Sequence, residues 1–211
     1  HESEPPYAYG GGVRVGGSAS FVNCALYGNV ASTGGGLFIY DGGSATLNSC
    51  QIYQNEASSG GGLWIRGFAT LTSCQISQNK ATYSGGLAIR NGGSATFDYC
   101  DISGNTASDG YEGGGLTIWG SATLEYCDIS GNTATSGGGL MIYGDAALNN
   151  CQIHNNEASF GVGLYITSAA HAVLTCCTVE DPVHGNYEEH KCPPPSPPSA
   201  PPPPLPPPLP P

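Results

Sequence analysis

Four acidic residues recur at matching positions in two neighbouring segments of the chain. Asp98 matches Glu125, and Asp101 matches Asp128. Carboxylates gathered on one face can bind Ca²⁺ or act as paired acids in glycan cleavage. No His or Lys shares these positions, and Arg90 lies on a different part of its segment. A solvated acidic face is therefore the favoured interpretation, with a calcium site as the alternative; we predict no catalytic residue and no cofactor.

Most of the nine cysteines share one position in a recurring pattern. These seven alternate in phase with isoleucine, so we expect a buried thiol ladder, and an odd number cannot pair completely. The other two, Cys176 and Cys192, flank the end of the pattern and are predicted to form a disulfide that staples the last repeat. That bond presumes an oxidising, extracellular compartment. The ladder consists of Cys24, Cys50, Cys74, Cys100, Cys127, Cys151 and Cys177.

Aromatic and arginine side chains form a third set. They occupy two positions in each repeat, one between a leucine and an isoleucine and one directly after that isoleucine. Both positions alternate away from the leucines and isoleucines, so we expect one solvent-facing strip with about 4.8 Å between repeats. Such a strip suggests a contact surface, and cross-strand stacking of strand-forming residues is the alternative. Its members are Phe38, Tyr40, Trp64, Arg66, Arg90, Trp119, Met141, Tyr143 and Tyr165.

The element that must position these side chains is a repeat of 24 to 28 residues with the pattern GGGLxI…AxLxxCxIxxNxA. A fixed period of this length indicates stacked units, none of which buries its apolar face alone. The glycine openings fall at Gly10, Gly34, Gly60, Gly85, Gly113, Gly137 and Gly161. The asparagine position holds Asn29, Asn55, Asn79, Asn105, Asn132 and Asn156, with Pro182 where a seventh is expected.

Each repeat contains three short alternating runs, Leu-x-Ile, Ala-x-Leu and Cys-x-Ile, which are typical of strands with one buried face. Glycine triplets make a helix unfavourable. We therefore predict an all-β fold, a single-stranded right-handed parallel β-helix of seven triangular coils over residues 10–182. The asparagines are placed at a turn, where asparagine tolerates left-handed geometry and its amide can bond to the next coil. Residues 1–9 are expected to form an N-terminal arm or cap, and residues 183–192 a C-terminal cap or linker.

The glycine-glycine-apolar and apolar-x-x-Asn elements, as in Gly61-Gly62-Leu63 and Ile52-Tyr53-Gln54-Asn55, carry a family resemblance. They resemble the right-handed β-helix repeats of polymorphic outer-membrane-type and pectate-lyase-like extracellular proteins. The resemblance covers residues 10–182. It implies the fold and leaves the function open, because that fold hosts adhesins, lyases, hydrolases and scaffolds.

Charge and hydropathy exclude two kinds of partner. The net charge is −11, and only Arg14, Arg66, Lys80, Arg90 and Lys191 could contact phosphates, so we expect no nucleic acid. No apolar run is long enough to span a bilayer. The longest excursion from the repeat, Ser108 to Glu112, is too short to enclose a catalytic cleft.

Residues 193–211 are mostly proline, fourteen of nineteen, and are predicted to adopt an extended polyproline II conformation. They resemble the Ser-Pro and poly-Pro modules of hydroxyproline-rich cell-wall glycoproteins of plants and green algae. That resemblance implies hydroxylation and O-linked glycans; a plain spacer or a ligand for aromatic grooves is the alternative. The implied O-glycosylation positions are Pro193, Pro194, Pro195, Ser196, Pro197, Pro198, Ser199, Pro201, Pro202, Pro203, Pro204, Pro206, Pro207, Pro208, Pro210 and Pro211.

Length connects the tail to a function. At about 3.1 Å per residue the tail extends about 60 Å, whereas seven coils at about 4.8 Å span about 34 Å. The tail can therefore reach along a neighbouring copy, with the aromatic strip or a groove beside it as the expected receptor. We predict a structural subunit of an extracellular, O-glycosylated filament or wall layer that assembles with itself head to tail. A carbohydrate-binding or carbohydrate-cleaving β-helix and an adhesin stalk, each with glycans as partners, are the alternatives.

Overall fold

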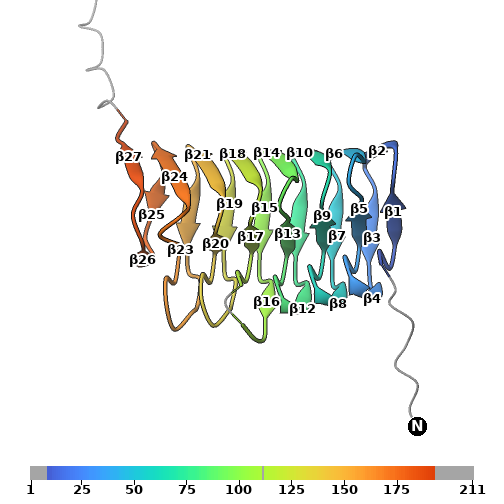
Figure 1. The fold of residues 1–211 in the computed structure, drawn as a ribbon, viewed down its shortest axis with the longest axis horizontal. Helices are drawn as coiled ribbons and strands as arrows, with labels where there is room; N and C mark the ends of the chain where they lie inside the picture. The colour runs from blue at the N-terminus through green and yellow to red at the C-terminus, as the bar shows by residue number, and fades with distance from the viewer. Residues whose placement is uncertain (1–8, 111, 193–211) are drawn as a thin grey trace, which may run out of the picture.

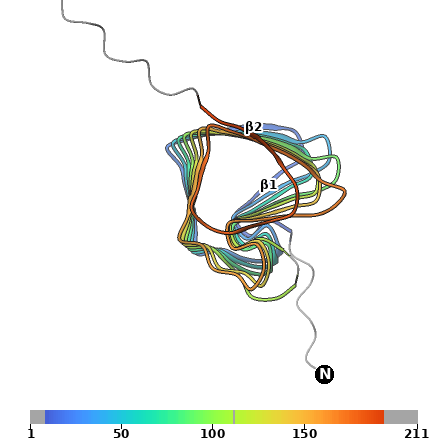
Figure 2. The ribbon, with the colours of Figure 1, turned by 90° about the vertical axis from the view of Figure 1, so that its left-hand side faces the viewer.

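The computed structural model describes residues 9–110 and 112–192. Every regular element in these ranges is a short β-strand, and successive strands wind into a rod of stacked coils (Figure 1). Seen end on, the coils superpose around one ring with a smaller lobe beside it (Figure 2). Strands from consecutive coils pair in parallel to form four sheets that run along the rod. The predicted all-β parallel β-helix is confirmed.

Sheet 1 contains the Leu-x-Ile runs. Its leucines and isoleucines lie in register from coil to coil, as in Leu87 opposite Leu116 and Ile89 opposite Ile118. The strands, in spatial order, are β1 (Val13–Val15), β5 (Leu37–Ile39), β9 (Leu63–Ile65), β13 (Leu87–Ile89), β17 (Leu116–Ile118), β20 (Leu140–Ile142), β23 (Leu164–Ile166) and β26 (Val183–His184).

Sheet 2 contains the Ala-x-Leu runs and sheet 3 the Cys-x-Ile runs. Sheet 2 is formed by β2 (Ser18–Val22), β6 (Ser44–Asn48), β10 (Phe68–Thr72), β14 (Ser94–Asp98), β18 (Ser121–Glu125), β21 (Asp145–Asn149), β24 (His171–Thr175) and β27 (Glu188–His190). Sheet 3 has seven strands, one for each predicted coil: β3 (Ala25–Tyr27), β7 (Gln51–Tyr53), β11 (Gln75–Ser77), β15 (Asp101–Ser103), β19 (Asp128–Ser130), β22 (Gln152–His154) and β25 (Thr178–Val179).

Sheet 4 was not predicted. It lies in the segment between the asparagine position and the next glycine opening, and it forms the smaller lobe of the cross-section (Figure 2). Its strands are β4 (Val30–Thr33), β8 (Glu56–Ser59), β12 (Lys80–Tyr83) and β16 (Thr106–Ala107). Each of the first four coils therefore has four strands rather than the three of a simple triangle.

The core consists of columns of equivalent apolar side chains that stack from coil to coil inside the ring. The Leu and Ile side chains of sheets 1 to 3 are almost wholly buried from the second coil onward, as in Leu63, Ile76 and Leu124 at 0% exposure. Complete burial of such a side chain contributes roughly 1.5–3 kcal/mol. Because each column runs through the whole rod, no coil has a core of its own. The glycine openings allow this stacking: a Cβ on Gly36 would lie 2.8 Å from the carbonyl oxygen of Gly62 in the next coil.

The turns use left-handed residues in fixed columns. The residue before each cysteine has φ between 53° and 55°, from Asn23 to Cys176. The residue before each asparagine is also left-handed, as in Gln54 and Gln78. A single residue of this kind turns the chain sharply at the end of a strand. The prediction that the repeated asparagine itself takes this conformation is therefore wrong.

The repeated asparagines form a hydrogen-bonded ladder instead, as their amides were expected to do. Each Nδ2 donates to Oδ1 of the asparagine in the next coil at 2.8–3.0 Å, and the backbone N–H donates to the same oxygen. From the second coil onward, Nδ2 also donates to a backbone carbonyl of the preceding coil. The four central members, Asn55 to Asn132, are at most 1% exposed.

The ladder ends on a carboxylate. Asn156 donates its backbone N–H and its Nδ2 to Oδ2 of Asp181, at 2.9 and 2.8 Å. Asp181 therefore takes the position assigned above to Pro182. An ionised carboxylate only accepts hydrogen bonds, so it closes a ladder in which each asparagine donates to the asparagine of the next coil toward the C-terminal end.

Residues 183–192 continue the coil, although they were expected to form a cap or linker. The strands β26 and β27 pair in parallel with β23 and β24 and add part of a further coil. At the other end, Tyr9 forms an isolated bridge with Thr33. Residues 1–8 of the expected N-terminal arm and residues 193–211 of the expected polyproline tail lie outside the described ranges. Within those ranges there is no helix that could cross a membrane.

Candidate functional site

One half of the predicted aromatic strip is buried. Phe38 and Met141, between the Leu and Ile of their coils, are 2% and 1% exposed, so the expectation that they face solvent is wrong. The glycine openings and the lobe fold back across this position, as shown by a Cβ on Gly34 lying 3.2 Å from Cβ of Phe38. Trp64 and Tyr165 occupy the same position and are half-buried.

The other half of the strip, directly after each isoleucine, lies at the surface. Tyr40, Arg90, Trp119 and Tyr143 are half-buried. Arg66 is exposed and forms an ion pair with Asp41, with 2.8 Å between Nη2 and Oδ2.

Arg90 joins the two halves by stacking between two indoles. Its guanidinium carbon lies 3.8 Å from the ring centroid of Trp119 and 5.0 Å from that of Trp64. Trp119 in turn stacks on Tyr143 with centroids 5.3 Å apart and an interplanar angle of 1°. Burial lowers the pKa of Arg90, opposed by the nearby carboxylate of Glu112.

This stack determines what the strip can bind. Rings that stack on one another along the rod have part of their faces covered by the neighbouring coil and present mainly their edges to solvent. Flat stacking of a sugar or a proline requires a free ring face. The Arg90–Trp119–Tyr143 stack therefore supports the alternative interpretation, in which most of the strip stabilises cross-strand contacts. A depression of about 290 Å³ remains beside it, lined by Trp64, Arg66, Arg90 and Asn91.

A polar cluster that the sequence analysis missed lies near this stack, where its carboxylate, Glu112, interacts electrostatically with Arg90 and Tyr143. Ser84 is fully buried, and its Oγ lies 2.6 Å from Oε2 of Glu112 and 2.8 Å from Oγ1 of Thr117. The backbone N–H of Gly113 donates to Oγ1 of Thr117 at 2.8 Å. Since each hydroxyl has one hydrogen, the chain runs from Gly113 through Thr117 and Ser84 to the carboxylate of Glu112.

Two features of the sequence mark this cluster. Ser84 replaces glycine at the first position of its opening and has a φ of 56°, a conformation that costs an L-residue roughly 1–2 kcal/mol. Glu112 ends the longest excursion from the repeat, Ser108 to Glu112. The Ser-for-Gly replacement and the longer coil were the available signals, and the contact between them requires the fold.

Burial raises the pKa of Glu112, against the hydrogen bond from Ser84 and the charge of Arg90, which lower it. The cluster has one carboxyl group, whereas glycoside hydrolysis generally uses two. Its geometry fits a role in positioning the excursion near the stacked strip.

The raised pKa predicts a pH-dependent stability. The folded state binds this proton more tightly than the unfolded chain, so the contribution of Glu112 is fully present below its ordinary pKa of 4.5 and is lost as pH rises through the raised value. We expect Glu112→Gln to remove this pH-dependent contribution to stability. The melting temperature of the variant should therefore increase relative to that of wild type as pH rises. Thermal unfolding from pH 3 to pH 8 measures it.

Asp109→Asn is the matched control, because Asp109 is an exposed acid of the same excursion whose carboxylate accepts a hydrogen bond from the neighbouring Gly110 amide. It should shift the melting temperature without this trend. Parallel pH profiles for wild type and Glu112→Gln would contradict the assignment.

The two acidic pairs lie in register as expected. Asp98 is opposite Glu125 at the ends of their strands, and Asp101 is opposite Asp128 at the start of the next. Asp101 accepts a hydrogen bond from Gln75 at 3.2 Å, and His154 Nε2 lies 3.2 Å from Asp128 Oδ1. Nowhere in residues 9–110 and 112–192 do three or more His, Cys, Asp or Glu side chains converge as a metal site, so the calcium alternative gains no support.

The cysteine column is present, and its two end members are less buried than the others. Its five central members are buried free thiols, whereas Cys24 and Cys177 in the terminal coils are only half-buried. The predicted disulfide between Cys176 and Cys192 is formed, with a sequence separation of 16 residues. It links the last residue described before the proline-rich tail to the end of β24. The O-glycosylation positions of that tail, Pro193 to Pro211, lie outside the described residues.

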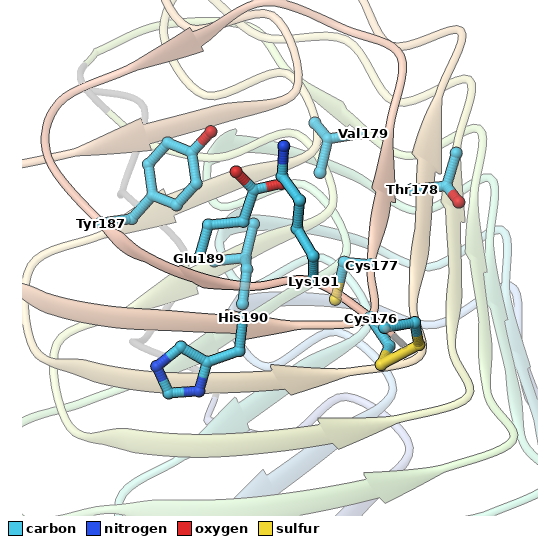
Figure 3. Close-up of a pocket in the computed structure, with 10 residues that line it drawn as sticks. Cys176, Cys177, Thr178, Val179, Tyr187, Glu189, His190 and Lys191 are labelled. Carbon is cyan, nitrogen blue, oxygen red and sulfur yellow. A yellow bond between two sulfur atoms is a disulfide. The ribbon is translucent and has the colours of Figure 1, made fainter. Parts of the chain in front are cut away.

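Charged side chains lie at the C-terminal end of the rod. A pocket of about 500 Å³ opens there onto Leu174, Cys177 and Val179, which face the core. Figure 3 shows Glu189 and Lys191 extending across this opening. Glu189 stands in register with Leu174 and thus occupies the core column. Inward-pointing charge is a device that discourages further strands from stacking on a sheet edge.

Comparison with known proteins agrees with the geometry. Residues 11–179 match the family model described as the right handed beta helix region. Neither a curated protein nor a solved structure matches the chain.

Proposed function

Because this chain belongs to the family of right-handed β-helix proteins, we propose that it is a structural subunit of an extracellular, O-glycosylated filament or wall layer. It acts without catalysis, and its proline-rich tail joins copies head to tail by lying on a neighbouring rod. The charged C-terminal end does not invite direct stacking of coils, so the tail provides the connection.

The observation that carries this proposal is the disulfide between Cys176 and Cys192, at the point where the tail begins. Tension applied to the tail passes through this bond to the end of β24 and bypasses the short strands β25 to β27. A covalent anchor at this position suits a tail that holds subunits together. The unbroken asparagine ladder and core columns suit the same role, because they couple every coil to the next.

Removal of residues 193–211 tests the proposal. We expect the full chain to form filaments or larger assemblies in electron micrographs of material purified from its native source, and the shortened chain to remain as single rods. Mass spectrometry of the tail peptide should show hydroxyproline-linked pentoses. Assemblies of unchanged order after the deletion would contradict the role of the tail.

The depression beside Trp64 favours a second candidate, a carbohydrate-binding β-helix or adhesin stalk. Two arginines and an amide beside an indole can recognise a sugar with an anionic group. This function predicts glycan-array binding by single rods that Trp64→Ala abolishes and the tail deletion leaves intact.

A further inference from the structure

The first coil differs from the last in both polarity and charge. Residues 9–33 contain one charged residue, Arg14, and no acid. Val22, Tyr27 and Val30 are 58%, 58% and 72% exposed, in a segment of nine residues around β3. The core side chains behind them, Phe21 and Leu26 among them, are only partly buried. The N-terminal end of the described rod is therefore an apolar edge.

This edge also carries unused hydrogen-bond donors. In every later coil the amide that opens sheet 3 donates to the coil before it, as Gln51 does to Cys24 at 2.8 Å. The amide that opens sheet 4 does the same, as Glu56 does to Asn29 at 2.9 Å. Ala25 and Val30 hold these positions in the first coil, and the described ranges contain no coil before it.

Tyr27 adds a flat apolar surface to the same edge. One face of its ring stacks on Tyr53, with centroids 5.0 Å apart and an interplanar angle of 7°. No second ring of the described residues stacks on the face that points toward the N-terminal end. Proline rings pack well on such faces, as in the aromatic grooves that bind proline-rich segments.

We propose that this first-coil edge, formed by Val22, Ala25, Tyr27 and Val30, binds the proline-rich segment 193–211 of a second copy. The proposal rests on the proposed function and names the receptor for the tail. Fourteen of the nineteen tail residues are proline, which offers a carbonyl acceptor and no N–H donor. Such a chain accepts from the amides of Ala25 and Val30 and leaves few donors of its own unpaired. The tail is uncharged, and so is the edge.

The C-terminal coil of another copy fits this edge poorly. Continued stacking would place Glu189 on Phe21, because both belong to the column of Leu174. It would also set the Asp181 carboxylate, an acceptor, against the acceptor Oδ1 of Asn29, since both end the same ladder. The tail carries neither conflict, and its length of about 60 Å exceeds that of the rod.

Photo-crosslinking in the full chain tests which segment binds the first-coil edge. Unlabelled protein that carries Tyr27→p-benzoylphenylalanine is mixed with ¹⁵N-labelled protein that has the native Tyr27. We expect crosslinks from position 27 to ¹⁵N-labelled peptides of the tail. Crosslinks only to the tail of the same copy, to residues 1–8 or to the C-terminal coil would overturn the proposal.

Sedimentation of surface variants tests how much the first-coil edge contributes to the affinity between copies. Val30→Lys is compatible with the coil because Lys80 already occupies this column beside Glu56. We expect it, and Tyr27→Ser, to raise the concentration of half-assembly at least about tenfold. Phe68→Lys, at an equally apolar position 57% exposed in the middle of the rod, is the matched control and should have no effect; circular dichroism checks that each variant folds.

The two proposals fail in different ways. Tail-dependent assembly that Val30→Lys and Tyr27→Ser leave unchanged would overturn the first-coil receptor and leave the proposed function standing. Wild-type protein that never assembles, with no crosslink between copies, would overturn both.

Discussion

Replacement of Asn105 by alanine is expected to lower the free energy of unfolding by about 4 kcal/mol. Oδ1 of Asn105 accepts from the backbone N–H and from Nδ2 of Asn79, both at 3.0 Å. Its own Nδ2 donates to the carbonyl oxygen of Ile76 and to Oδ1 of Asn132. The variant leaves two donors of Asn79 buried without an acceptor, and an unpaired buried group costs about 1–3 kcal/mol. Denaturant unfolding followed by circular dichroism measures the change.

Asn29→Ala is the matched control for this prediction. Asn29 belongs to the same ladder but is half-buried in the first coil, where it donates to Asn55 without accepting from another member of the ladder. We expect a loss of about 1 kcal/mol there. Equal losses at the two positions would show that water relaxes the middle of the ladder and that burial does not set its strength.

Much of the fold could be predicted because the repeat places equivalent residues at a nearly constant spacing along the chain. Identical residues at a nearly constant spacing must lie above one another once the units stack, so the Leu, Ile, Cys and Asn columns followed from position alone. The same reasoning paired Asp98 with Glu125. The disulfide was predicted from what remained, because Cys176 and Cys192 are the only cysteines outside the column.

Alternation could not show what lies outside the ring. Segments such as Glu56–Ser59 contain small polar residues, and their strand character comes from pairing with the neighbouring coil. The strip positions pointed away from the core as predicted, but this second layer covers Phe38 and Met141. An outward direction in a strand therefore predicts exposure only when nothing packs over the sheet.

The candidate site escaped prediction for a related reason. Ser84, Glu112 and Thr117 come from two successive coils and share no repeat position, so no column joins them. Asp181 escaped prediction because spacing alone places the next ladder position at Pro182. A carboxylate preserves the acceptor of asparagine and removes the donor, which is what the last member of a one-directional ladder requires.

The second large effect is expected at the C-terminal end of the rod. Cys192→Ser removes the disulfide and frees the 16-residue connection to Cys176. In the chain-entropy account, closing a loop of this size contributes about 3 kcal/mol, here to the attachment of β25 to β27. The amide of Cys176, which donates to the carbonyl oxygen of His190 at 2.8 Å, should then exchange its hydrogen about a hundredfold faster. Hydrogen exchange read by mass spectrometry measures this, and amides of the central coils should be unchanged.

Cys177→Ser is the control that distinguishes loss of the disulfide from the effect of replacing a cysteine by serine. Cys177 is a half-buried free cysteine beside the bridge, and its Sγ donates to the carbonyl oxygen of Leu148 at 3.3 Å, which a serine hydroxyl can also do. We expect that variant to exchange as wild type does. Faster exchange in both variants would assign the effect to local packing. Fast exchange in Cys192→Ser alone would show that the bridge holds the last strands in place, as a tail under tension requires.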